Sequence, residues 1–131
     1  MEPKENGRLL PAEQGVYTLL GFAQKAGCLL GGSDVVAQAV SRGQARLVLL
    51  AWDLSDNSCR RFWQHLAEEP AGGRKLQVWR FGAKQQLGQA VGKPPRGIWA
   101  LQDENFCRGI LAKLQQLQSV APNLACLAEK P

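Results

Sequence analysis

One short apolar run limits the folds open to this chain more than any other feature. Residues 47–51 read Leu-Val-Leu-Leu-Ala, with no polar residue between the apolar ones. Both faces of such a strand carry side chains that avoid water, so both faces must be covered. We therefore expect a sheet with helices packed against each of its sides.

Helical and strand-like segments alternate around this run. Apolar residues recur at helical spacing in residues 16–26, 36–40, 59–66, 84–91 and 106–117. Short strand-like patterns occur in residues 28–31, 76–81 and 97–101. Strands that alternate with helices predict a layered arrangement, so the expected fold class is α/β, a three-layer α/β/α sandwich.

Polar residues at segment starts predict where the helices begin. Ser33 and Ser55 are expected to be the N-caps of the second and third helices, since a side-chain oxygen there accepts from free backbone N–H groups. Asp103 or Asn105 is expected to start the last helix. Gly92 is expected to end the short fourth helix.

The chain length of 131 residues suits one domain. We expect that domain at residues 13–118, between a flexible N-terminal tail at residues 1–12 and a C-terminal tail at residues 119–131. No apolar run approaches the roughly 18 residues that a membrane helix needs, and no signal-like apolar stretch follows the polar first residues. The expectation is a cytoplasmic protein without a membrane partner.

Cysteine spacing favours neither a disulfide framework nor a metal centre. Cys28, Cys59, Cys107 and Cys126 include no C-x-x-C pair, and His65 is the single histidine. A metal site would need such ligands in a cluster. The cysteines are interpreted as small core side chains, and we predict no metal and no cofactor.

Catalytic motifs are also missing. The chain has no phosphate loop, no G-x-S-x-G elbow and no H-E-x-x-H. His65 is interpreted as a half-exposed surface residue, and Asp53 and Asp56 as acids near a helix start, where they are stabilising. We predict that the protein is not an enzyme and has no small-molecule substrate.

The formal charge of +5 favours an anionic partner, although this bias is too modest to identify one. The tryptophans fall at strand or helix-stripe positions and are interpreted as packing residues rather than as platforms for bases. Arg60 and Arg61 are interpreted as a solvated helix face that can add general attraction to phosphate.

Two glycine-rich clusters carry more information. Gly31 and Gly32 precede a predicted helix N-terminus, where backbone N–H groups attract phosphate and absent side chains permit close approach. The alternative is that these glycines serve only the geometry of a turn.

The second cluster, Gly-Lys-Pro-Pro-Arg-Gly at residues 92–97, follows the fourth helix. Pro94 and Pro95 stiffen it, and Lys93 and Arg96 are cations that such a loop could hold towards a backbone phosphate. The alternative is an ordinary solvated loop.

The order of these pieces carries a family resemblance. The stretches LLGFAQKAGCLLGGSDVVAQAVSRGQARLVLLAWDLSDNS and FGAKQQLGQAVGKPPRGIWAL resemble the kink-turn-binding ribosomal protein family, most of all its bacterial YlxQ-like branch. The resemblance covers residues 16–117. Its best signatures are residues 39–43 and residues 87–93, in this order and at this separation.

The resemblance implies an α/β/α sandwich around a four-stranded mixed sheet. It also implies a non-enzymatic protein that binds structured RNA, either a kink-turn or a related internal loop. We further expect a monomer that acts on ribosomal or regulatory RNA. The contact surface would be the second-helix N-terminus plus the loop after the fourth helix. Carried over to this chain, the RNA-binding residues are Gly31, Gly32, Ser33, Asp34, Val35, Gln38, Lys93, Pro94, Pro95 and Arg96.

The carry-over also reveals departures from the family pattern. Gly32 and Ser33 match its opening pair, whereas Asp34 replaces Asn, Val35 replaces Glu and Gln38 replaces Lys. Asp34 accepts but does not donate hydrogen bonds, Val35 makes none, and Gln38 has no charge. Each lost base contact should cost about 1–3 kcal/mol of binding free energy. An alternative is therefore a protein-interaction module that keeps the fold and has lost specific RNA readout.

Overall fold

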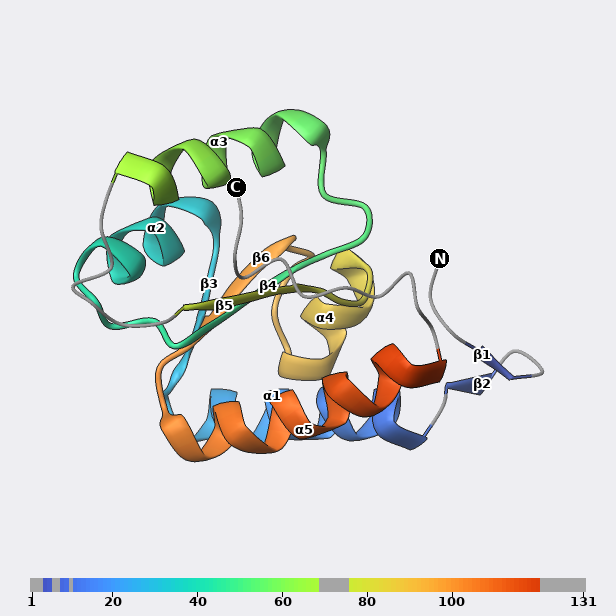
Figure 1. Cartoon of the computed structure of the whole chain (residues 1–131). Coiled ribbons are helices and arrows are strands. Elements are labelled where there is room, and N and C mark those ends of the chain that lie inside the picture. Colours follow the sequence, from blue (N-terminus) through green and yellow to red (C-terminus); the bar gives the residue numbers. More distant parts are fainter. Residues whose placement is uncertain (1–3, 6–7, 10, 69–75, 121–131) are drawn as a thin grey trace.

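The computed structural model describes residues 4–5, 8–9, 11–68 and 76–120 (Figure 1). In chain order the elements are β1 (Lys4–Glu5), β2 (Arg8–Leu9), α1 (Pro11–Lys25), β3 (Leu29–Gly31), α2 (Ser33–Ser41), β4 (Leu47–Leu50), α3 (Asp56–Glu68), β5 (Gln77–Arg80), α4 (Lys84–Val91), β6 (Ile98–Leu101) and α5 (Glu104–Val120). The first helix begins at Pro11, inside the segment expected to be a tail.

The central sheet has four strands in the order β3-β6-β4-β5. Strand β6 is antiparallel to both of its neighbours, and β4 is parallel to β5. The sheet is therefore mixed, as the resemblance implied. The carboxyl ends of β3, β4 and β5 meet the start of β6 at one edge, and α2, α3 and α4 begin beyond that edge.

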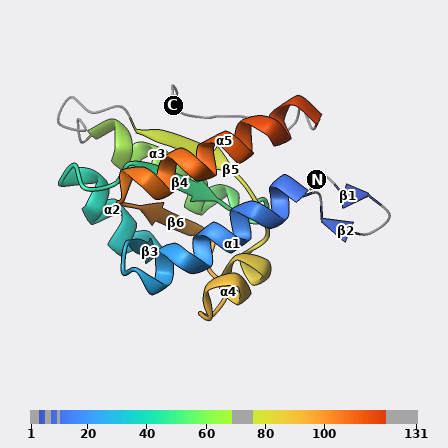
Figure 2. The same cartoon turned by 90° about the horizontal axis from the view of Figure 1, so that it is seen from below.

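Helices cover both faces of the sheet. Figures 1 and 2 show α1 and α5 side by side on one face, with α2 and α3 on the other. Alternate residues of β4 divide between two cores: Leu47 and Leu49 pack with α1 and α5, while Val48 and Leu50 pack with α2 and α3. All four side chains are fully buried, which confirms the three-layer sandwich expected from residues 47–51.

Two tryptophans lie where a packing role requires them. Trp79 and Trp99 are each 2 % exposed and belong to the core between the sheet and α1 and α5. Trp52 and Trp63 are half-buried against the two cores. The interpretation as packing residues is therefore confirmed.

One predicted helix cap is wrong. Gly32, not Ser33, occupies the N-cap position of α2, with φ 107° and ψ 148° and no side-chain cap bond. The chain must turn sharply out of β3, and this backbone conformation is essentially restricted to glycine. Ser33 is the first helical residue.

The other predicted caps are confirmed. The Ser58 N–H donates to Ser55 Oγ at 3.1 Å at the start of α3. Asp103 Oδ1 accepts from the N–H groups of Asn105 and Phe106 at the start of α5. Gly92 ends α4 in the left-handed conformation.

The described cysteines are free thiols with different degrees of burial. Cys107 is 5 % exposed, and burial raises its pKa to about 12. Cys28 and Cys59 are half-buried, and burial, followed by the nearby Asp103 carboxylate, raises the pKa of Cys28. Cys126 lies outside the described residues.

Candidate functional site

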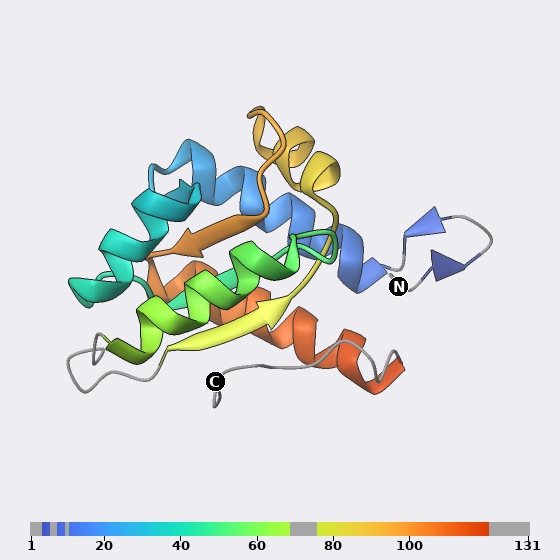
Figure 3. The ribbon, with the colours of Figure 1, turned by 90° about the horizontal axis from the view of Figure 1, so that it is seen from above.

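The pairing of β3 with β6 brings the two glycine-rich clusters together. The strands are antiparallel, with Gly31 opposite Trp99. Helix α2 follows β3, and residues 92–97 lead into β6, so both clusters lie at the same edge of the sheet (Figure 3). The clusters are more than fifty residues apart in the chain, and only the sheet topology places them side by side.

Backbone geometry explains the glycines of the first cluster. A Cβ on Gly31 would lie 2.6 Å from the ring of Trp99. The N–H of Gly32 donates to the Ile98 carbonyl at 2.9 Å, and the Gly32 carbonyl accepts from Val36 at the start of α2. The interpretation that these glycines serve a turn therefore holds, and it leaves the adjoining helix start open to a ligand.

A side chain joins the two clusters directly. Arg96 donates from Nη1 to the Gly31 carbonyl at 3.2 Å. The Trp99 indole N–H donates to the Arg96 carbonyl at 2.9 Å and holds the backbone of the same residue. Since guanidinium has five N–H donors, a contact with one carbonyl still leaves it able to contact phosphate.

The loop after α4 rests on that helix through a glycine. The Lys93 N–H donates to the Gly88 carbonyl at 2.9 Å. A Cβ on Gly88 would lie 2.6 Å from the Lys93 carbonyl oxygen and 2.7 Å from that of Pro94. The close contact holds residues 93–95 against α4.

Most of the predicted site residues are exposed around this junction. Helix α2 buries Val36, Ala39 and Val40 and leaves its other side in solvent. The exposed residues are Ser33, Asp34, Val35, Gln38, Lys93, Pro94, Pro95 and Arg96. Together with Gly31 and Gly32, they form what we call the helix–loop surface.

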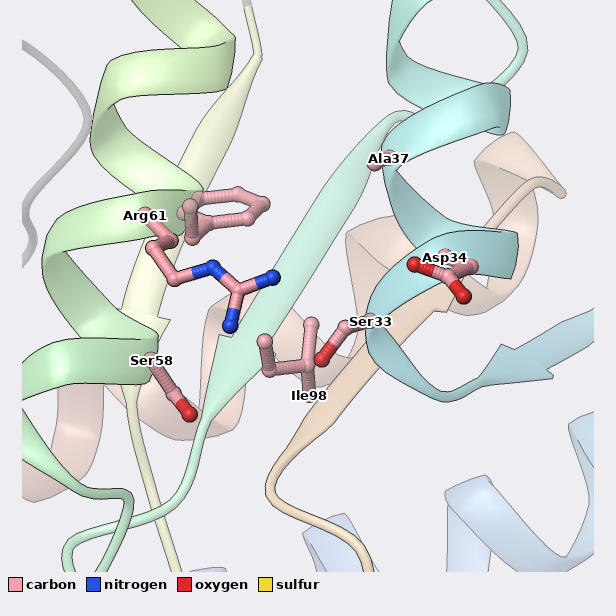
Figure 4. A pocket seen from close by; sticks show the side chains of 7 residues that line it. Ser33, Asp34, Ala37, Ser58, Arg61 and Ile98 are labelled. Atoms are coloured by element: carbon pink, nitrogen blue, oxygen red, sulfur yellow. The ribbon is translucent and has the colours of Figure 1, made fainter.

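A groove adjoins this surface between α2 and α3. It has a volume of about 180 Å³ and is lined by Ser33, Asp34, Ala37, Ser58, Arg61, Phe62 and Ile98. Figure 4 shows the Arg61 guanidinium extending from α3 towards Ser33 and Ile98. The interpretation of Arg61 as part of a solvated helix face is incomplete, because the sequence of α3 does not reveal that α2 packs beside it.

Asp53 and Asp56, interpreted from the sequence as acids near a helix start, both lie at such positions. Asp53 Oδ1 accepts from the Lys84 N–H at 3.0 Å and so caps α4. Asp56 lies in the first turn of α3. The described residues contain no group of three metal-ligating side chains, and the His65 side chain lies outside them. No described helix is long and apolar enough to cross a membrane.

Comparison with known sequences gives one family and two relatives. The model of the ribosomal protein L7Ae/L30e/S12e/Gadd45 family matches residues 14–111. The RNA-binding protein YlxQ of Bacillus subtilis (strain 168) is 26 % identical over 98 residues, which cover 75 % of this chain and 93 % of that protein. The RNA-binding protein YlxQ of Enterococcus faecium is 22 % identical and covers 72 % of this chain and 86 % of its own length.

Solved structures share the fold. A protein of unknown function from Bacillus halodurans C aligns with a TM-score of 0.66 and 31 % identity, covering 75 % of this chain and 94 % of its own. The Giardia lamblia 15.5kD RNA binding protein aligns with a TM-score of 0.63 and 14 % identity, covering 92 % of this chain and 94 % of its own. The names of three of these four proteins specify RNA binding, and none specifies a reaction.

Proposed function

Because the chain belongs to the ribosomal protein L7Ae/L30e/S12e/Gadd45 family, we propose that it is a non-enzymatic protein that binds structured RNA at the helix–loop surface. The resemblance inferred from the sequence, including that to the YlxQ-like branch, is confirmed by the family match and the YlxQ relatives. The relatives named as RNA-binding proteins support RNA as the partner.

The observation that carries this proposal is the contact between Arg96 and the Gly31 carbonyl. It joins a helix start to a cationic loop on one exposed surface. Phosphate contacts position a nucleic acid, and contacts to base edges read its sequence. A surface that reads an internal loop needs both kinds of contact close together.

The two halves of the helix–loop surface suit these different tasks. Lys93 and Arg96 are exposed cations for the RNA backbone. Asp34 is an exposed acceptor for guanine amino groups, whereas Val35 offers only apolar contact and Gln38 only neutral hydrogen bonds. We propose a kink-turn or related internal loop as the ligand, bound less tightly than the family's Asn, Glu and Lys would bind it.

Further parts of the proposal follow from this ligand. The matched family is one of ribosomal proteins, so we include ribosomal RNA among the targets and place the protein in the cytoplasm. One helix–loop surface per chain is enough for one RNA loop, so we propose that the protein acts as a monomer.

The direct test is binding to a standard kink-turn RNA and to total ribosomal RNA across a salt series. We expect salt-dependent binding, because each phosphate contact releases counterions. Lys93→Ala should weaken binding and lower the salt slope by about one. Lys93 suits this test because its side chain makes no hydrogen bond or ion pair among the described residues.

Arg108→Ala is the matched control. Arg108 is an exposed cation on α5, on the opposite face of the sheet, where it pairs with Glu104 at 3.2 Å. The control loses one positive charge without touching the helix–loop surface, so its affinity should match the wild type. Equal losses for both variants would reduce the effect to net charge, and no binding to either RNA would refute the function.

A protein-interaction module is the second candidate, and one observation favours it. Val35 is 47 % exposed in the middle of the helix–loop surface. An apolar side chain at this place suits contact with a protein partner better than it suits contact with the edge of a base. The salt series decides between the candidates, since only RNA binding predicts a steep salt slope.

A further inference from the structure

We propose that the groove between α2 and α3 binds a backbone phosphate of the same RNA, with Arg61 as the cation that contacts it. The proposal rests on the proposed function and extends the contact surface onto α3. The groove and the helix–loop surface share Ser33 and Asp34. The groove therefore opens beside the helix–loop surface, within reach of an RNA strand bound there.

Arg61 is placed to receive a phosphate. Its guanidinium extends across the groove towards Ser33 (Figure 4). Within the described part of the chain, Arg61 has no ion pair. Guanidinium binds phosphate with two parallel N–H bonds, which makes arginine the preferred residue for such a contact.

The rest of the groove provides space and hydroxyl groups. Its volume of about 180 Å³ far exceeds the roughly 10–15 Å³ that a single water needs. Ser33 and Ser58 present hydroxyl groups from opposite walls (Figure 4). Hydroxyl groups donate to phosphate oxygens, so the two serines suit an anion as ligand. Ala37, Phe62 and Ile98 form the apolar part of the lining.

Asp34 lies on the α2 wall of the same groove and opposes an anion there. Its carboxylate repels phosphate and competes for the guanidinium. This opposition makes the proposal unusually easy to test, because two residues in one groove should affect RNA affinity in opposite directions.

The groove also bears on the missing charge at position 38. Gln38 carries no charge where the family pattern has Lys. Arg61 supplies a cation from the neighbouring helix instead, one that the α2 pattern does not reveal. We infer that α3 supplies, through Arg61, a cation beside the binding face that α2 lacks at position 38.

The neighbouring Arg60 is a matched control for Arg61. Both are exposed arginines of α3, but Arg60 bonds Asn57 Oδ1 at 3.4 Å along its own helix and does not line the groove. Arg60→Ala and Arg61→Ala therefore remove the same charge one residue apart.

The experiment measures affinity for a kink-turn RNA across a salt series. Arg61→Ala should bind about threefold to tenfold more weakly, with a salt slope smaller by about one, while Arg60→Ala stays near the wild type. Arg61→Lys should recover part of the loss, and Asp34→Asn should bind more tightly. Melting temperatures like that of the wild type would show that the variants are folded.

Several results would overturn the inference. Equal behaviour of Arg61→Ala and Arg60→Ala would do so, as would an Asp34→Asn variant that binds no more tightly than wild type. Inorganic phosphate should compete only weakly with the kink-turn RNA for binding. If phosphate lowered the RNA affinity of the wild type strongly and that of Arg61→Ala not at all, the groove would be a site for free anions. If the wild type binds no RNA at all, the proposed function fails rather than the assignment of Arg61 alone.

Discussion

At the scale of single residues, ligand binding at the start of α2 depends on exposed side chains that the turn itself does not require. Gly31 and Gly32 are required by the turn, because of the Trp99 ring and the positive φ respectively. Asp34 and Gln38 are exposed and could be replaced without disturbing a core. Functional differences between members of this fold should therefore concentrate at such exposed positions.

Gln38→Lys tests the cost of the uncharged residue at this position. Restoring a cation beside the helix–loop surface should strengthen binding to a kink-turn RNA by about threefold to tenfold at low salt. Gln115→Lys is the control, since Gln115 is an exposed residue of α5 on the other face of the sheet. An unchanged affinity for Gln38→Lys would mean that position 38 does not contact the RNA.

Cys107 predicts a pH dependence of stability. Burial raises its pKa from the ordinary 9.0 to about 12. Above pH 9 the unfolded chain releases the thiol proton while the folded protein keeps it, so the stabilising contribution is complete below pH 9 and is lost as the pH rises towards 12.

The measurement is urea denaturation between pH 7 and pH 10 in the presence of reductant. The wild type should lose up to about 1.4 kcal/mol more unfolding free energy than Cys107→Ala over that interval. The Cys107→Ala variant serves as the reference for the wild type, because every other titrating group is common to both proteins. Parallel pH profiles would contradict a buried neutral thiol.

At the scale of elements, the loop after α4 is held against its own helix. Gly88 lets the Lys93 and Pro94 carbonyls approach the helix backbone. The sequence shows an ordinary short helix that ends at Gly92, and this end is confirmed. The sequence does not reveal the role of Gly88, because the atoms that it contacts belong to the backbone of the loop and not to side chains.

Gly88→Ala should displace this loop. The added methyl group would meet two carbonyl oxygens at 2.6 and 2.7 Å, so the loop must shift or the fold lose about 1–3 kcal/mol. Affinity for RNA should fall with it, although no contact residue has changed. The control is Lys93→Ala, which removes a cation and should leave the melting temperature unaltered. If Gly88→Ala had the melting temperature and the RNA affinity of the wild type, the close contact at Gly88 would be excluded.

At the scale of the whole molecule, the two cores are coupled through the middle strands of the sheet. Leu49 packs in the core against α1 and α5, and Leu50 in the core against α2 and α3. Both are fully buried in the same strand. We therefore expect the helix pairs on the two faces to lose their packing together.

Leu49→Ala and Leu50→Ala form a matched pair that tests this coupling. Each should lower the free energy of unfolding by about 2–5 kcal/mol, because a large side chain is removed from a filled core. Both should leave one transition, with helix content and tryptophan fluorescence changing together. Separate transitions for the two signals in Leu50→Ala would mean that the α2 and α3 layer unfolds by itself.

Local sequence patterns predicted the fold class and most of the element positions. Hydrophobic periodicity and capping residues act over a few residues, so the strand at residues 47–51, the Ser55 cap and the end at Gly92 could be predicted locally. The predicted Ser33 cap is wrong, because the Gly32 N–H is bonded to the Ile98 carbonyl where β3 pairs with β6. A contact between residues so far apart in the chain cannot be read from the neighbouring sequence.

Contacts between residues far apart in the chain assemble the candidate site. The hydrogen bond from Arg96 to Gly31 spans 65 residues, and the groove joins Arg61 of α3 to Ser33 of α2. Such neighbours are set by strand order and helix packing, which depend on the burial of the whole core and leave no periodic trace in the chain. The sequence revealed the two clusters, and the fold placed them on one surface.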